Sequence, residues 1–264
     1  MLKFRSSLPI VLITTLVSGC RSDDGAPAIS ASPPPVAVVA LQPTPTPSPT
    51  ATASPTPPPA PTPTSSVKGD GKIVLVTEGD SISITWGGNY TGMYKAARPD
   101  IVFHGKAVGG SGIRNLETRL PTILALEPDM VTIFIGANDL ASYENASAYL
   151  MALRSYIEKI KATGAKVVIA TVLPQQLTDV NRSAKHNVMR KELANFLRQA
   201  TWVDGLVDFA ADPEMGPDEA ALNKALYTDG LHPTDGTHGV GEGGQVKLYR
   251  VFKPVVDQLL KDVR

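Results

Sequence analysis

A serine follows a strongly apolar run early in the sequence. Residues 72–77 are mostly apolar and partly β-branched, and Gly79, Asp80 and Ser81 follow them after Glu78. A run of this length without polar alternation is typical of a strand buried on both faces in a parallel sheet. Gly79 can turn the chain where the strand ends, and open α/β sheets place their ligand cleft at that end. We therefore expect Ser81 to project into a cleft, although Gly-Asp-Ser is also ordinary turn chemistry.

A carboxylate and a histidine that could activate this serine lie near the other end of the chain. Asp229 and His232 are three residues apart, and on a turn this spacing can bring the carboxylate to the far nitrogen of the imidazole. Nucleophilic catalysis by serine needs a base and a group that fixes the tautomer of that base. The residue types predict acyl transfer, with Ser81 as nucleophile, His232 as general base and Asp229 as the group that orients it.

A second Asp-x-x-His pair follows at once, formed by Asp235 and His238. Only one pair can serve the serine. We favour the first because Leu231 and Pro233 suit a packed turn, whereas glycines surround His238.

The elements that must position these residues alternate along the chain. Besides residues 72–77, the strands that we expect are 101–103, 130–135, 166–170 and 206–209. Amphipathic periodicity predicts helices over 114–126, 146–162, 181–200 and 244–263. This alternation predicts an α/β fold, with a parallel sheet of about five strands between two layers of helices, in one domain over 69–264.

Four stretches at the predicted strand ends and in the tail resemble, in order, the four sequence blocks of the SGNH (GDSL-type) hydrolases. They are Gly79-Asp80-Ser81, residues 107–112, residues 136–139 and residues 229–232. The resemblance covers about residues 72–260 and implies a flavodoxin-like serine esterase without a cofactor. It also implies that the backbone N–H groups of Ser81 and Gly110 and the side-chain amide of Asn138 form the oxyanion hole. Gly105 departs from the family, which often has asparagine at this position. The loop after His232 is also extended, by residues 237–242.

Several polar or aromatic residues near these blocks have simpler explanations. We expect Asp80 to hold the nucleophile turn through backbone contacts, and Asp139 to cap the helix that follows it. His104 and His186 lack an acidic partner at a telling spacing, so we expect both to be structural or surface residues. Trp86, Tyr90 and the loop of Gln175 and Gln176 could line the pocket or could simply pack.

The first nineteen residues have the pattern of a secretory signal. A short basic start precedes an apolar stretch over 8–17, which is too short to span a membrane. Cys20, the only cysteine, follows Leu-Val-Ser-Gly, a sequence that resembles the lipobox of bacterial lipoproteins. The resemblance implies signal cleavage after residue 19 and lipidation of Cys20, and Arg21 in place of aspartate favours the outer membrane. An ordinary signal peptide with a chance cysteine is the alternative.

Residues 20–68 are rich in Pro, Thr, Ala and Ser and predict a disordered linker. The whole chain carries 25 basic and 25 acidic residues among 264, so its charge gives no reason to expect a nucleic-acid partner. The histidine and cysteine spacings do not indicate a metal site, apart from His232 and His238.

The sequence thus predicts a lipid-anchored esterase of the cell envelope that acts on O-acetyl or short-chain acyl esters, such as those on carbohydrates. A lipase, lysophospholipase or thioesterase that acts on acyl lipids is an alternative. A non-catalytic binding protein on the same fold is another.

Overall fold

The computed structural model describes residues 71–235 and 243–263. The predicted signal sequence, Cys20, the whole predicted linker and His238 therefore lie outside the described residues.

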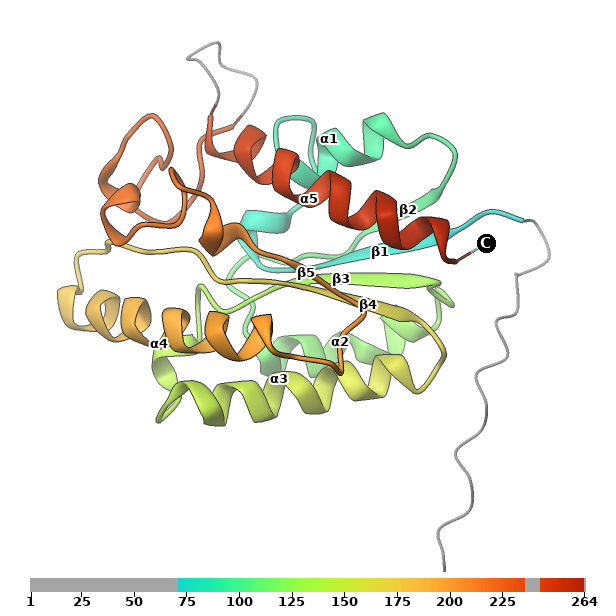
Figure 1. The fold of residues 1–264 in the computed structure, drawn as a ribbon, viewed down its shortest axis with the longest axis horizontal. Coiled ribbons are helices and arrows are strands. Elements are labelled where there is room, and N and C mark those ends of the chain that lie inside the picture. The colour runs from blue at the N-terminus through green and yellow to red at the C-terminus, as the bar shows by residue number, and fades with distance from the viewer. Residues whose placement is uncertain (1–70, 236–242, 264) are drawn as a thin grey trace, which may run out of the picture. The chain divides into compact units, whose positions relative to one another are not determined.

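Five parallel strands form one sheet in the order β2-β1-β3-β4-β5 (Figure 1). The strands are β1 (Val74–Gly79), β2 (Val102–Gly105), β3 (Met130–Phe134), β4 (Lys166–Ala170) and β5 (Gly205–Val207). β1 lies between β2 and β3, so that Val76 pairs with His104 on one side and with Val131 on the other. The five-stranded parallel sheet predicted from the sequence is confirmed.

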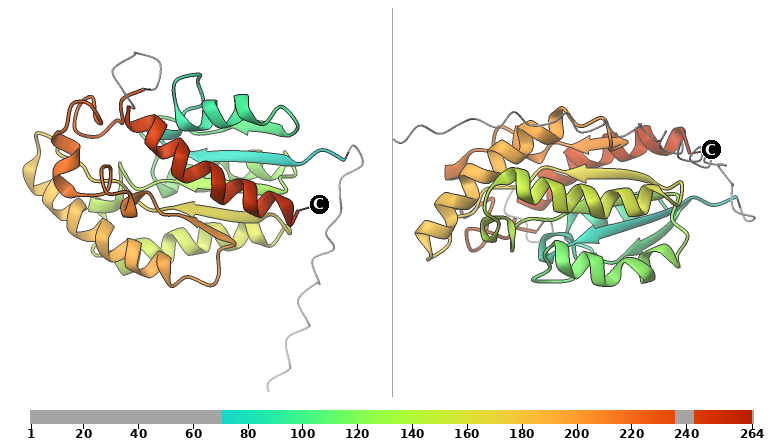
Figure 2. Two further views of the ribbon diagram at one scale, coloured as in Figure 1. Left: turned by 45° about the horizontal axis from the view of Figure 1, so that its top comes forward. Right: turned by 90° about the horizontal axis from the view of Figure 1, so that it is seen from below.

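Helices cover both faces of the sheet, as the alternating pattern predicted (Figures 1 and 2). One face carries α1 (Tyr90–Ala97) and α5 (Gly244–Lys261). The other carries α2 (Ile113–Leu124), α3 (Ala146–Lys161) and α4 (Val180–Arg198). Short 3-10 helices complete the described part: η1 (Ser81–Ser83), η2 (Leu140–Ser142), η3 (Phe209–Ala211) and η4 (Asp218–Leu222).

The end of one strand and the presence of one helix differ from what the sequence predicts. Phe209 was expected to end the last strand, but β5 ends at Val207 and Phe209 begins η3. Helix α1 was not expected, because it has only eight residues and contains a glycine. Gly92 is required there, since a Cβ at this position would lie 1.7 Å from the Trp86 carbonyl oxygen. Asn89 begins the helix by accepting a hydrogen bond from the Gly92 N–H at 2.9 Å.

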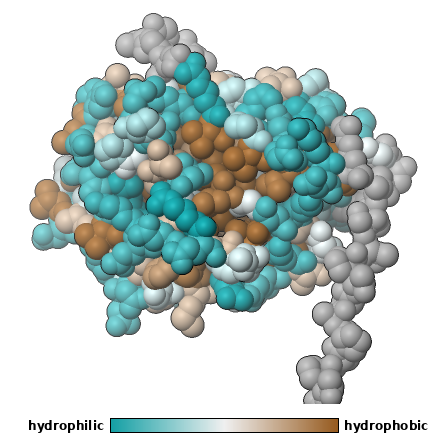
Figure 3. Space-filling model, viewed as in Figure 1, coloured by the Kyte–Doolittle hydropathy of each residue, from teal (hydrophilic) through white to brown (hydrophobic). Residues whose placement is uncertain are grey.

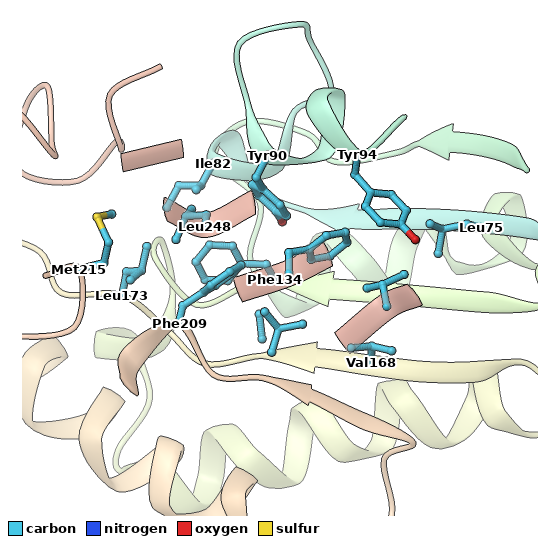
Figure 4. Packing of buried hydrophobic residues seen from close by; sticks show 14 of the residues in the cluster. Leu75, Ile82, Tyr90, Tyr94, Phe134, Val168, Leu173, Phe209, Met215 and Leu248 are labelled. Atoms are coloured by element: carbon cyan, nitrogen blue, oxygen red, sulfur yellow. The ribbon is translucent and has the colours of Figure 1, made fainter. Parts of the chain in front are cut away.

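Each face of the sheet has its own hydrophobic core. Beneath α1 and α5, the ring of Tyr90 lies edge-on to Phe209 and Phe252, with centroids 5.6 and 5.0 Å apart. Phe134 packs against Phe209 at 5.0 Å, and Figure 4 shows the side chains of Tyr90, Phe134 and Phe209 gathered together in this core. Half-buried apolar side chains of α5 extend this core outward, and Figure 3 shows an apolar area over that helix.

The order of the strands brings three loops together. β1 and β3 are neighbours, and the chain leaves them toward opposite edges of the sheet, which creates the crevice where open α/β sheets bind ligands. Because the strands are parallel, the loops that follow β2, β1 and β3 lie at the same edge. These are the loops that carry Gly110, Ser81 and Asn138.

Candidate active site

A sharp turn at the end of β1 presents Ser81. Gly79 has φ +155°, and a Cβ there would lie 2.3 Å from the Phe134 carbonyl oxygen, so the close contact between β1 and β3 requires glycine. The carboxylate of Asp80 accepts a hydrogen bond from the Ile82 N–H at 3.0 Å and so begins η1. Asp80 is buried and holds the turn as expected, while Ser81, the next residue, is half-buried.

Ser81, His232 and Asp229 form a continuous chain of hydrogen bonds. The Ser81 Oγ lies 2.9 Å from His232 Nε2, and His232 Nδ1 lies 2.7 Å from Asp229 Oδ2. Desolvation opposes ionisation of Asp229, but hydrogen bonds from the backbone and the ring of His232 outweigh it and lower the pKa of this carboxyl. A carboxylate in this position favours the tautomer that leaves Nε2 free to accept the serine proton.

The turn that carries Asp229 and His232 is tied to the rest of the fold. Gly230 has φ +86°, and a Cβ there would lie 2.2 Å from the Gln176 carbonyl oxygen. The Gln176 N–H donates to the Gly230 carbonyl at 2.8 Å, which joins this turn to the loop after β4. Within the turn, Asp229 Oδ1 accepts from the His232 N–H at 2.8 Å. The local spacing therefore works as the sequence predicted, with a glycine that makes the close approach possible.

The second Asp-x-x-His pair is described only in part. Asp235 lines the cavity beside Ser81, and His238 lies outside the described residues. The contact of Ser81 with His232 supports the first pair, and the role of His238 stays a prediction.

Gly110 lies in a loop that packs beside the serine. The Val108 N–H donates to the Gly79 carbonyl at 3.2 Å, and a Cβ on Gly109 would lie 3.9 Å from the Ser81 Cβ. Gly110 has φ +73°, which favours glycine, and no atom of the described residues would lie within 4 Å of a Cβ there. The backbone at Gly110 is therefore accessible to a small ligand.

The side chain of Asn138 is oriented by the same loop. Its Nδ2 donates to the Ser111 carbonyl at 3.0 Å, and because a primary amide has two N–H donors, the second remains for another acceptor. Arg182 on α4 holds the backbone by donating to the Asn138 carbonyl at 2.8 Å. The structure thus places the Asn138 side chain in direct contact with the loop that carries Gly110, and the role of both residues as oxyanion donors stays a prediction.

The prediction for Asp139 was wrong. The sequence suggested that it caps the helix that follows, but that helix is only η2, and the Asp139 carboxylate accepts instead from the Ile113 N–H at 2.7 Å. Ile113 is the first residue of α2, so Asp139 caps a helix 26 residues earlier in the chain. The reason is spatial: the loop after β3 abuts the start of α2, and a Cβ on Gly112 would lie 2.4 Å from the Asp139 carboxylate.

The other histidines have structural positions. His186 is buried, its Nε2 lies 3.0 Å from the Leu173 carbonyl, and burial lowers its pKa to about 4. His104 on β2 is half-buried, and desolvation, together with Lys106 and Lys95, lowers its pKa. Both histidines therefore agree with the structural interpretation.

A cavity of about 520 Å³ opens beside Ser81 and His232. Trp86, which is 46% exposed, forms part of its wall, so this residue lines the pocket. The other lining residues are Ile82, Lys224, Ala225, Thr228, Pro233, Thr234, Asp235, Gly243 and Gln245. Sequence reasoning did not find Lys224 or Gln245, because neither stands in a motif and both come from parts of the chain remote from Ser81.

Within the ranges that the structure describes, no group of three or more His, Cys, Asp and Glu side chains could hold a metal ion.

Asp80 makes stability depend on pH. Burial raises the pKa of its carboxyl from 3.8 to about 7, so between these values the folded protein holds a proton that the unfolded chain releases. This contribution to stability is complete below the lower value and is lost as the pH rises through the higher one. Urea unfolding of wild type and Asp80→Asn at about pH 4.5 and about pH 8 should show wild type losing more stability over this interval. Parallel losses would contradict the assignment.

The chain belongs to the GDSL-like lipase/acylhydrolase family, whose sequence profile matches residues 79–240, and it is accordingly a serine ester hydrolase. No curated protein sequence matches it significantly. TesA is a similar solved structure, with 22% identity, a TM-score of 0.51 and coverage of 70% of this chain and 99% of its own. A GDSL-like lipase from Bacteroides thetaiotaomicron is 19% identical, with a TM-score of 0.53 and coverage of 75% and 93%. At these identities the structures show a shared fold.

Proposed function

We propose that this protein hydrolyses O-acetyl or short-chain acyl esters, such as those on carbohydrates, through an acyl-enzyme on Ser81. The observation that carries the proposal is the chain of hydrogen bonds from Ser81 through His232 to Asp229, next to the two loops that carry Gly110 and Asn138.

Each residue has one task in this reaction. His232 Nε2 accepts the proton as Ser81 Oγ attacks the ester carbonyl, and Asp229 stabilises the imidazolium that forms. The oxyanion receives hydrogen bonds from the N–H groups of Ser81 and Gly110 and from the Asn138 amide. His232 then passes its proton to the leaving alcohol, and water releases the acyl group by the same steps in reverse.

The lining of the cavity favours a substrate whose alcohol part is polar. The cavity opens beside Ser81 and His232, and because His232 protonates the leaving group, we place the alcohol part of the substrate in it. Trp86 offers a flat apolar ring, while Lys224 offers a cationic group. A sugar presents an apolar ring face and a rim of hydroxyls that fit such a combination.

A second candidate, hydrolysis of acyl lipids, is favoured by one observation. Ile84 and Val108 near Ser81 are apolar and are 39% and 49% exposed, and they could contact an acyl chain. Rates with p-nitrophenyl acetate, butyrate and palmitate, measured alongside acetylated xylan, separate the two candidates. We expect acetate and acetylated xylan to be preferred, and a preference for palmitate would replace the carbohydrate proposal.

Trp86 provides a sharper test of the carbohydrate. We expect Trp86→Ala to raise KM for acetylated xylooligosaccharides about tenfold, because it removes a stacking surface, while p-nitrophenyl acetate is hydrolysed nearly as before. Phe196→Ala is the matched control, since Phe196 is 40% exposed on α4 and does not line this cavity. Equal effects of Trp86→Ala on both substrates would argue against a sugar platform.

We further propose that lipidated Cys20 tethers the enzyme to the cell envelope, with the outer membrane favoured by Arg21. Support comes from the position of the only cysteine after the lipobox-like residues. In the part of the chain that the structure covers, no helix is long and apolar enough to cross a membrane.

Cys20→Ser should move the protein from the membrane fraction to the soluble fraction, because the acyl chains supply the anchoring energy. Mass spectrometry of the mature amino terminus checks the proposal in wild type. An unmodified Cys20, or processing at another residue, would refute it.

A further inference from the structure

Arg119 on α2 joins two of the loops that form the site. Its Nη1 donates to Ser111 Oγ at 2.8 Å, and its Nη2 donates to the Gly79 carbonyl at 3.3 Å. The third nitrogen, Nε, donates to Glu78 Oε1 at 3.3 Å. One guanidinium therefore contacts the end of β1 and the loop after β2 at the same time.

The guanidinium is in turn held in place by the buried side chain of Glu78. The side chain of Glu78 has no exposed surface and also accepts a hydrogen bond from the Tyr156 hydroxyl on α3. Arg119 is 20% exposed, so its ion pair with Glu78 is largely shielded from water. A shielded carboxylate with two donors fixes the position of the cation more firmly than a surface pair would.

Every proposed oxyanion donor lies close to a contact of Arg119. The Gly79 carbonyl is two residues before Ser81, and Ser111 directly follows Gly110. The Ser111 carbonyl accepts the hydrogen bond from the Asn138 amide. A shift of Arg119 would therefore move three donors relative to one another.

We propose that Arg119, anchored by Glu78, is a positioning residue that sets the spacing of the oxyanion donors. This inference rests on the proposed function, because it takes Ser81, Gly110 and Asn138 as those donors. The planar guanidinium reaches three acceptors in fixed directions, whereas a lysine ammonium is a single point charge and cannot hold the same three.

Arg119→Lys is the first test, because it keeps a positive charge beside Glu78 and removes the planar fork. We expect Tm to change little and kcat per active site, titrated by the p-nitrophenol burst, to fall about tenfold or more. KM for p-nitrophenyl acetate should change less than about twofold, since the donors act mainly on the transition state. Arg154→Lys is the control, because Arg154 forms an exposed ion pair with Glu158 on α3.

The ratio of the rates with an ester and with its thiono analogue is a second measurement, and a general loss of folding would not change this ratio. The C=S sulfur accepts hydrogen bonds weakly, so a thionoester benefits less from the oxyanion donors. We expect Arg119→Lys to slow p-nitrophenyl acetate more than its thiono analogue and so to reduce the preference of the enzyme for oxygen about threefold or more. The control variant should keep the wild-type preference.

If Arg119→Lys does not fold, a double variant tests the inference instead. Arg119→Met combined with Glu78→Gln removes the cation without leaving a buried charge, and glutamine can still accept from Tyr156. Unchanged kcat in a folded variant, or equal losses with ester and thionoester, would overturn the inference. Hydrolysis by Ser81→Ala would overturn the proposed function instead, so the two failures are distinguishable.

Discussion

Ser81→Ala is expected to abolish ester hydrolysis, with kcat/KM falling at least about 10⁴-fold. The change removes the one oxygen that bonds to His232 Nε2 and leaves the backbone of the nucleophile turn unchanged. The turn itself depends on Gly79 and Asp80, so the protein should fold. Activity on p-nitrophenyl acetate, with far-UV circular dichroism and Tm as checks on folding, measures this.

Ser83→Ala is a suitable control for this substitution. Ser83 lies two residues farther on in η1, is buried, and bonds to the Tyr90 hydroxyl at 2.7 Å rather than to His232. Its loss should lower stability by about 1 kcal/mol and leave most of the activity. More than a few per cent of wild-type activity in folded Ser81→Ala would eliminate it as the nucleophile.

His232→Ala should be nearly inactive at every pH, whereas His238→Ala should keep most of the rate. His232 lies between Ser81 and Asp229, and protonation of its ring removes the acceptor for the serine proton. Wild-type kcat/KM should therefore decrease at acidic pH. Profiles of kcat/KM against pH for wild type and both variants provide the measurement.

Substitutions of the two aspartates should differ in their effect on activity in the same way. Asp229→Asn should cost less than His232→Ala, because the imidazole remains but loses the charge that orients it. Asp235→Asn should have little effect on kcat. The reverse pattern, with His238→Ala inactive and His232→Ala active, would move the catalytic pair to Asp235 and His238.

Predictions from the sequence succeeded where local residues determine the structure. β4 was predicted with its observed bounds because Lys166–Ala170 is a short apolar run between two helical patterns. Asp229 and His232 could be paired from the sequence because three residues of turn are enough to close the contact. Because the five strands were predicted to be parallel, the positions of their carboxyl ends indicated which loops lie together at one edge of the sheet.

Predictions failed where distant residues decide. Asp139 caps α2 rather than η2 because of a packing contact between two loops, which no local pattern reports. Arg119 reads in the sequence as an ordinary cation on an amphipathic helix, and its acceptor Glu78 lies 41 residues away. Helix α1 was missed because eight residues hold too few turns for periodicity to appear.

Mapping a covalent adduct tests the central claim most directly. A serine-directed fluorophosphonate applied to the folded wild-type protein should modify a single residue, and tandem mass spectrometry should place the adduct on Ser81, with no labelling in His232→Ala. An active enzyme labelled at another residue, or one that stays active after complete modification of Ser81, would contradict the account.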